Sequence, residues 1–199
     1  MDGDAVTRDA LAARDGDPAA TARFVRATQA DVWRLVAHLA GREVADDLTQ
    51  ETYLRALRAL PRFAGRSAAR TWLLVIARRV CADHVRAAAR DRRAAGAGMG
   101  GGTGVLPDVG EGVALRSVLA ALAPERREAF VLTQLVGLSY AEAAEVCGCP
   151  VGTIRSRVAR ARADLVSSLR HDARSTGPAG PAGPAGPAGP DCGHLSALW

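Results

Sequence analysis

The sequence predicts an all-α protein made of two small helical domains joined by a flexible linker. Apolar residues recur at helical spacing through residues 21–90 and again through residues 113–165. Between these regions, residues 94–112 read AAGAGMGGGTGVLPDVGEG, a glycine-rich stretch with little apolar periodicity. We therefore expect a mobile N-terminus at 1–18, a first domain at 19–93, the linker at 94–112, a second domain at 113–173 and a Pro/Gly/Ala-rich tail at 174–199.

Composition and charge narrow the functional classes. The chain of 199 residues has a formal charge of +5, and six arginines against two aspartates fall in residues 151–174, an excess that attracts polyanions. No apolar run is long enough to span a membrane, and the N-terminus MDGDAVTRDA is acidic rather than signal-like. The four cysteines are too few and too irregularly spaced for a disulfide framework or a paired zinc site. We expect a soluble cytoplasmic protein without a metal or cofactor.

Three helices are expected in the first domain. The first covers about residues 21–41 and the second about residues 46–60, where Pro61 stops it. A short basic loop, PRFAGRS, covers residues 61–67, and a long helix follows to about residue 90. This long helix should bury a stripe at i, i+3, i+4 and i+7: Leu73, Ile76, Ala77 and Val80.

The second helix has one apolar side and one charged side. Its packed face should contain Tyr53, Ala56, Leu57 and Leu60. The opposite side should present Asp47, Glu51, Arg55 and Arg58. Glu51 and Arg55 stand four apart and can form an ion pair. A solvated charged face is the simpler interpretation, but Leu48 projects among the acids, which favours a docking surface.

The basic loop and the helix after it combine aromatic and arginine side chains. Phe63 and Trp72 lie near several arginines in the sequence. Aromatic rings can stack on unpaired bases while guanidinium groups neutralise phosphates, which favours binding to a single nucleic-acid strand. For Trp72 alone, packing in the core is the better interpretation.

Residues 139–165 predict a helix-turn-helix. Ser139 and Glu142 stand three apart, as in a capping box, and Gly148 and Pro150 punctuate the turn before a second helix that ends near residue 165. One side of this helix should pack through Val151, Ile154, Val158, Ala161 and Leu165. The opposite side should present Thr153, Ser156, Arg157 and Arg160, with Arg155 and Arg162 nearer the packed edge. An ordinary surface helix is the alternative, but such a face has the donors that read DNA in a major groove.

Four stretches in this order resemble the extracytoplasmic-function (ECF) group of bacterial RNA polymerase sigma factors of the sigma-70 family, and most of all their actinobacterial sigma-C-type branch. They are ADDLTQETYLRALRAL (45–60), RFAGRSAARTWLLVIARRVCADHVR (62–86), LAPERREAFVLTQLVGLSYAEAAEVCG (122–148) and CPVGTIRSRVARARADL (149–165). The resemblance covers about residues 20–170. It implies a sigma-2-like first domain and a sigma-4-like helix-turn-helix domain; the tail at 177–199 departs from the family pattern.

The resemblance also implies partners and site residues. Contacts to the β′ clamp helices of core RNA polymerase fall on Asp46, Asp47, Leu48, Gln50 and Glu51. Contacts to the single-stranded minus-10 element fall on Phe63, Arg66, Ser67, Arg70, Trp72, Arg78, Arg79 and Arg86. Contacts to the duplex minus-35 element fall on Thr153, Arg155, Ser156, Arg157 and Arg160, and this domain also meets the β flap. Whether an anti-sigma factor binds the chain stays open.

The chain is then expected to promote transcription initiation without being an enzyme, since catalysis belongs to the polymerase. A helix-turn-helix regulator that is not a polymerase subunit is the alternative. A response regulator would need an α/β receiver domain, and a serine recombinase would need an α/β catalytic domain around a nucleophilic serine. The helical pattern of the first half favours neither.

Overall fold

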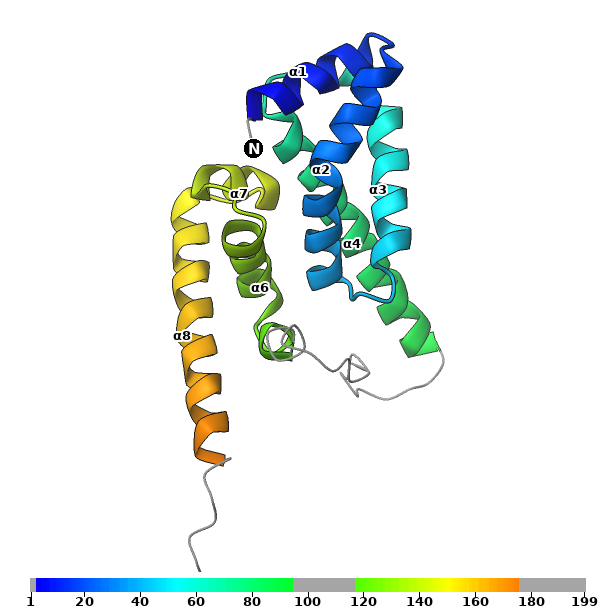
Figure 1. Cartoon of the computed structure of the whole chain (residues 1–199). Helices are drawn as coiled ribbons and strands as arrows, with labels where there is room; N and C mark the ends of the chain where they lie inside the picture. The colour runs from blue at the N-terminus through cyan, green and yellow to red at the C-terminus, as the bar shows by residue number, and fades with distance from the viewer. Residues whose placement is uncertain (1–2, 95–116, 176–199) are drawn as a thin grey trace, which may run out of the picture.

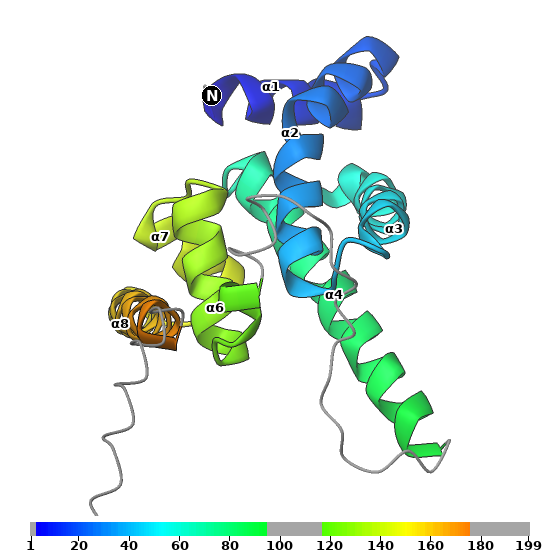
Figure 2. The same ribbon diagram turned by 60° about the horizontal axis from the view of Figure 1, so that its bottom comes forward.

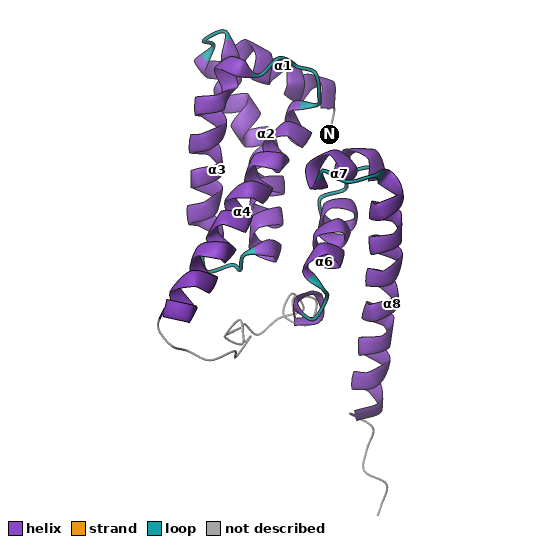
Figure 3. Cartoon of the chain, turned by 180° about the vertical axis from the view of Figure 1, so that it is seen from behind, coloured by secondary structure: helices purple, strands orange, loops and turns teal. Residues whose placement is uncertain are grey.

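The computed structural model describes residues 3–94 and 117–175 (Figure 1). Within these residues every regular element is a helix, as Figure 3 shows, which confirms the all-α prediction. The elements are α1 (Gly3–Arg14), α2 (Pro18–Leu39), α3 (Ala45–Ala59), the short 3-10 helix η1 (Leu60–Arg62), α4 (Ala69–Ala94), α6 (Pro124–Phe130), the π-helical turn η2 (Val131–Leu135), α7 (Tyr140–Cys147) and α8 (Val151–Ser175). The predicted linker beyond Ala94 and the predicted tail beyond Ser175 lie outside the described residues.

Helices α2, α3 and α4 run side by side and form the body of the first domain (Figure 1). Asp17 caps α2, because its Oδ1 accepts hydrogen bonds from the backbone N–H groups of Ala19 and Ala20 at 2.8 and 3.1 Å. The side chains that fill the core between the three helices expose 1% of their surface or less: Phe24, Val32, Leu35, Val36, Leu73 and Leu74. Burying each of them contributes about 1.5–3 kcal/mol, so the apolar spacing along the chain dictates which sides of the helices meet.

Residues 3–14 form helix α1, so the prediction of a mobile N-terminus at 1–18 was wrong for these residues. Helix α1 lies across the end of α2 (Figure 2). Its buried residues are Val6, Ala10 and Ala13, which expose 3%, 0% and 9% of their surface. They stand at i, i+4 and i+7, but two of the three are alanines, so the apolar period is faint among the surrounding aspartates.

Helix α8 begins as expected but runs on past the predicted end at residue 165 to Ser175. After Gly152 in the first turn, no glycine or proline occurs before Gly177, so no local signal stops the helix earlier. Figure 1 shows its last turns extending away from the rest of the second domain. In the described part of the chain, no helix has the length and apolar character needed to cross a membrane.

The two domains pack against each other. Helix α4 contacts α7, and α2 contacts η2. A single cluster of buried apolar residues includes Leu73 and Leu74 of the first domain together with Leu138 and Val146 of the second. The glycine-rich composition predicts a flexible linker between the two domains. It does not predict that the domains pack against each other, because this packing depends on the shapes of the two domain surfaces.

Candidate nucleic-acid and polymerase interfaces

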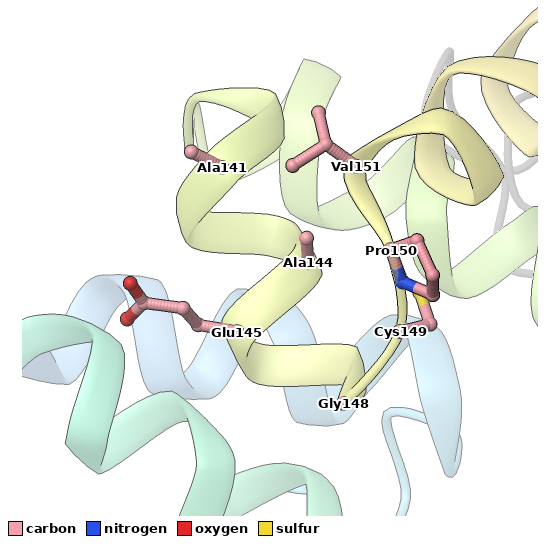
Figure 4. A pocket seen from close by; sticks show the side chains of 7 residues that line it. All are labelled: Ala141, Ala144, Glu145, Gly148, Cys149, Pro150 and Val151. Atoms are coloured by element: carbon pink, nitrogen blue, oxygen red, sulfur yellow. The ribbon is translucent and has the colours of Figure 1, made fainter.

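The helix-turn-helix is built from the predicted capping residues. Ser139 Oγ accepts a hydrogen bond from the Glu142 N–H at 3.2 Å, and Glu142 Oε2 accepts one from the Ser139 N–H at 2.8 Å. Gly148 ends α7 in the left-handed conformation, with a φ of 65°. A shallow hollow at this turn is lined by Ala141, Ala144, Glu145, Gly148, Cys149, Pro150 and Val151 (Figure 4). The caps and the glycine together fix the angle at which α8 leaves α7.

One side of α8 packs on the second domain and the other side faces solvent. The packed residues Ile154, Val158 and Ala161 expose 1% of their surface or less. Of the residues assigned to the minus-35 element, three are exposed: Arg155, Ser156 and Arg160. A helix with this division can enter a major groove with its hydrogen-bond donors foremost while its apolar side stays in the protein.

Two arginines of α8, Arg155 and Arg157, lie in the opposite arrangement to the one predicted. Arg157 is half-buried, and its Nη1 lies 3.8 Å from the Cys149 Sγ. Arg155 is exposed, so the prediction that it lies nearer the packed edge than Arg157 was wrong. Arg162 is also exposed, and its Nη2 donates to Gln134 Oε1 at 2.8 Å. A helical wheel places residues 155 and 157 on the two flanks of the buried stripe, and only the neighbouring turn decides which flank is covered.

Residues 61–68 connect α3 and α4, and we call them the minus-10 loop. Phe63 is buried, with 4% of its surface exposed, and its ring centroid lies 4.9 Å from that of the half-buried Trp72. This tilted pair supports the loop from within, which agrees with the packing interpretation of Trp72. Arg66 is exposed and Ser67 is half-buried, so they form the accessible part of the loop. Phe63 can meet a base only after leaving this pair.

Two arginines assigned to the minus-10 element are occupied by contacts that join the domains. Arg70 donates from Nε to Asp31 Oδ2 at 2.7 Å and from Nη2 to the carbonyl oxygen of Val136, in the second domain, at 2.6 Å. Arg78 forms an ion pair with Glu128, also in the second domain, with 3.3 Å between Nη2 and Oε2. The hydrogen bond to Glu128 raises the pKa of Arg78. These two guanidinium groups are therefore not free to bind DNA in this arrangement.

The two remaining arginines of the set lie on the solvent side of α4. Arg79 and Arg86 are both exposed. Arg86 Nη2 donates to Asp83 Oδ1 at 2.7 Å, and Asp83 also accepts from Arg55 Nη1 at 2.8 Å. These hydrogen bonds lower the pKa of the Asp83 carboxyl, which therefore stays ionised at neutral pH.

The acidic residues of α3 lie at the surface, but several have partners. Asp46 Oδ1 accepts a hydrogen bond from Trp33 Nε1 at 2.8 Å. The predicted pair of Glu51 and Arg55 is confirmed, with 2.7 Å between Oε1 and Nε. Leu48 is half-buried and packs against the core, so the prediction that it projects among the acids was wrong.

The exposed side of α3 carries two leucines that the sequence analysis missed. Leu54 and Leu57 expose 44% and 39% of their surface, although Leu57 was expected to pack inward. Asp47 and Gln50 are exposed on the same side, because residues 47, 50, 54 and 57 fall on one helical stripe. We call these four residues the α3 docking face. Two exposed leucines beside polar groups are typical of a protein-binding surface.

Cys81 and Cys147 show no feature of a reactive thiol. Burial raises the pKa of both Cys81 and Cys147 to about 12, so both stay protonated at neutral pH. No group of three or more His, Cys, Asp or Glu residues suited to a metal ion occurs in residues 3–94 and 117–175. Cys147 and Cys149 flank the turn of the helix-turn-helix and pack there.

Family models and known relatives agree on one assignment. Residues 24–91 match the model for sigma-70 region 2, and residues 112–165 match the model for sigma-70 region 4. The chain is 53% identical over 175 residues to the ECF RNA polymerase sigma factor SigC of Mycobacterium tuberculosis, covering 86% of this chain and 95% of the relative. It is 39% identical over 142 residues to the ECF sigma factor EcfG of Rhodopseudomonas palustris, covering 67% of this chain and 76% of the relative.

Two solved structures share the fold. The structure of CnrH in complex with the cytosolic domain of CnrY has a TM-score of 0.68 at 29% identity, and the match covers 84% of this chain and 99% of that chain. The sigma factor RpoE of Bartonella quintana, in complex with the anti-sigma factor NepR, has a TM-score of 0.68 at 27% identity, covering 76% and 98%. Sigma factors bind core RNA polymerase and promoter DNA and are not enzymes. The chain thus belongs to the ECF sigma factors of the sigma-70 family and acts in transcription initiation.

Proposed function

We propose that this sigma factor holds core polymerase through the α3 docking face and holds a promoter at two separate points. The minus-10 loop and α4 take the single-stranded minus-10 element, and α8 takes the duplex minus-35 element. The observation that carries most weight is the exposed row of Arg155, Ser156 and Arg160 on a helix whose other side packs through Ile154, Val158 and Ala161. Run-off transcription with purified core polymerase tests the proposal: transcripts from promoters of this factor should appear only when the chain is added.

The same experiment separates the alternative of a helix-turn-helix regulator. A regulator would change transcription by a holoenzyme that already contains another sigma factor. It would not enable core polymerase alone to initiate. The promoters themselves are found by sequencing transcription start sites after overexpression, which reads both promoter elements at once.

Opening of the minus-10 element follows from binding alone in this proposal. Extruding a base from the duplex costs a few kcal/mol, and stacking and phosphate contacts made only by the open strand offset that cost. Arg66 and Ser67 are the accessible residues of the loop, with Arg79 and Arg86 along α4. Arg70 and Arg78 join them once the two domains separate, because both are paired across the domain contact in this arrangement.

A charged residue in the α3 docking face is expected to weaken polymerase binding. Leu54→Arg should lower affinity for core polymerase about tenfold or more, because apolar anchors at the centre of an interface each contribute 1.4 kcal/mol or more. Val85→Arg is the matched control, since Val85 is equally exposed, at 46%, but lies on α4. Affinity is measured by titrating labelled core polymerase with each variant. If Leu54→Arg and the wild type bind core polymerase with equal affinity, the α3 docking face does not bind the polymerase.

A substitution on the exposed side of α8 is expected to weaken DNA binding without affecting polymerase binding. Arg160→Ala should weaken binding to a duplex minus-35 element by about five- to a hundredfold, the range for one specific arginine contact of about 1–3 kcal/mol. Arg170→Ala, an exposed arginine farther along α8, is the control. Fluorescence anisotropy with labelled duplex measures the first effect and a core-polymerase pull-down the second. A loss of both activities together would contradict the assignment.

We also infer that an anti-sigma protein is among the partners, as well as the β flap for the second domain. CnrH and RpoE were both solved in complexes, the latter with an anti-sigma factor. In this chain the α3 docking face and the exposed side of α8 are the accessible surfaces that such a protein would have to cover.

A further inference from the structure

We infer that helix α1 is a positioning element for the minus-10 loop, and that Thr7, Leu11 and Arg14 are the residues through which it acts. The inference rests on the proposed function, because the loop's role in capturing the open strand is part of that proposal. Helix α1 lies across the end of α2 (Figure 2). It is outside both regions matched by the family models, the first of which begins at residue 24. Neither the DNA contacts nor the polymerase contacts proposed above involve it.

The contacts from α1 reach the beginning, the middle and the end of the loop region. Arg14 Nη1 donates a hydrogen bond to the carbonyl oxygen of Phe63 at 3.2 Å. Leu11 lies under Gly65, close enough that a Cβ at residue 65 would stand 3.5 Å from its Cδ2. Thr7 Oγ1 accepts a hydrogen bond from the N–H of Ala69, the first residue of α4, at 3.1 Å.

These three side chains form a single row. Residues 7, 11 and 14 stand at i, i+4 and i+7, so they share one face of α1. Arg14 is held in place for its role, since its Nε and Nη2 both donate to the carboxylate of Asp15, at 2.8 and 3.2 Å. The remaining nitrogen, Nη1, is the one that reaches the loop.

Helix α1 is anchored independently of the loop. A neighbouring face buries Val6, Ala10 and Ala13 against the first domain. Asp9 Oδ1 also accepts a hydrogen bond from Arg23 Nε of α2 at 2.8 Å. The row of contacts is thus presented from a fixed helix and does not depend on the loop for its own position.

The physical role of the row is to order the loop before DNA arrives. The first N–H groups of a helix lack partners within the helix, and Thr7 supplies one for α4 from a different helix. Gly65 adopts a φ of 68°, a turn that Leu11 supports from below. Arg66 and Ser67 stay on the accessible side. A loop that is already ordered loses less conformational freedom on binding, so the strand is held more tightly.

The test removes one hydroxyl group and then restores it. Thr7→Val keeps the shape of the side chain but cannot accept the hydrogen bond of Ala69, whereas Thr7→Ser can. Holoenzyme reconstituted with full-length Thr7→Val should bind the fluorescein-labelled non-template minus-10 strand of a mapped promoter about three- to tenfold more weakly, the usual effect of one hydrogen bond. Thr7→Ser should restore affinity. Thr21→Val is the control, because its hydroxyl donates within α2 to the carbonyl oxygen of Asp17 and touches no part of the loop.

Two further measurements separate positioning from general damage. Affinity for core polymerase and for the minus-35 duplex should be unchanged in Thr7→Val. Hydrogen exchange should accelerate in the peptide containing Ala69 and not in peptides from α2 and α3. If Thr7→Val binds the minus-10 strand as the wild type does, or if all three affinities fall together, the inference is overturned. If wild-type holoenzyme does not bind the strand, the proposed function fails instead, and the two failures are distinguishable.

Discussion

Phe24→Ala is expected to reduce the free energy of unfolding by about 3–5 kcal/mol, the usual cost of removing a buried phenyl ring. Phe24 is fully buried in α2 and belongs to the core shared with α3 and α4. A loss of this size is a large fraction of the 5–15 kcal/mol that stabilises most domains. Urea unfolding followed by circular dichroism measures it.

The control for Phe24→Ala is a substitution of an exposed apolar residue in the same domain. Val85 exposes 46% of its surface, so Val85→Ala should change the free energy of unfolding by less than about 0.5 kcal/mol. A change below 1 kcal/mol for Phe24→Ala would show that the core is not packed around this ring.

Arg78→Glu is expected to separate the two domains. Glu128 exposes 8% of its surface, and the substitution places a second carboxylate against it. Removing the partner of a buried charge costs about 3–5 kcal/mol, and the partial exposure of Arg78 reduces that figure. The radius of gyration, measured by small-angle X-ray scattering, should increase relative to the wild type.

A charge swap provides the control for this prediction. The double variant Arg78→Glu with Glu128→Arg restores opposite charges at the two positions and should return the radius of gyration toward that of the wild type. Arg79→Glu changes the charge of the neighbouring exposed residue and should leave the scattering unchanged. Identical scattering from Arg78→Glu and the wild type would contradict a stabilising role for this ion pair.

Local signals in the sequence predicted the parts of the fold that depend on local chemistry. The capping box of Ser139 and Glu142 and the left-handed Gly148 were both found in the expected conformations. The pair of Glu51 and Arg55 depends only on spacing along one helix and was also confirmed. Such features are encoded within five residues, so a single sequence suffices to identify them.

Features that depend on contacts between distant segments were predicted less well. Helix α1 was missed because its buried face consists mostly of alanine, and its position depends on contacts with α2 and α4. Leu57 was placed on the wrong side of α3 because the wheel of one helix does not show how far its neighbours extend. The roles of Arg70 and Arg78 in joining the domains required the positions of Asp31, Val136 and Glu128, which come from other segments of the chain.

The candidate site residues show the same difference between local features, which the sequence predicts, and contacts between distant segments, which it does not. The sequence placed the candidate DNA-binding arginines on the correct helices, but only the structure distinguishes accessible groups such as Arg155 from occupied ones such as Arg157. The resemblance to ECF sigma factors implied roles for individual residues. It did not indicate which side chains are paired within this chain.

The contact between the two domains has a consequence for how the protein responds to concentration. Both domains belong to one chain, so their association is intramolecular, and dilution of the protein does not dissociate them. Only a molecule that binds the separated form more tightly than the associated form shifts this equilibrium, and the shift cannot exceed the difference between those two affinities. A change in the amount of this sigma factor therefore does not by itself change the fraction of molecules with separated domains; that fraction changes only when a partner binds the two forms with different affinities.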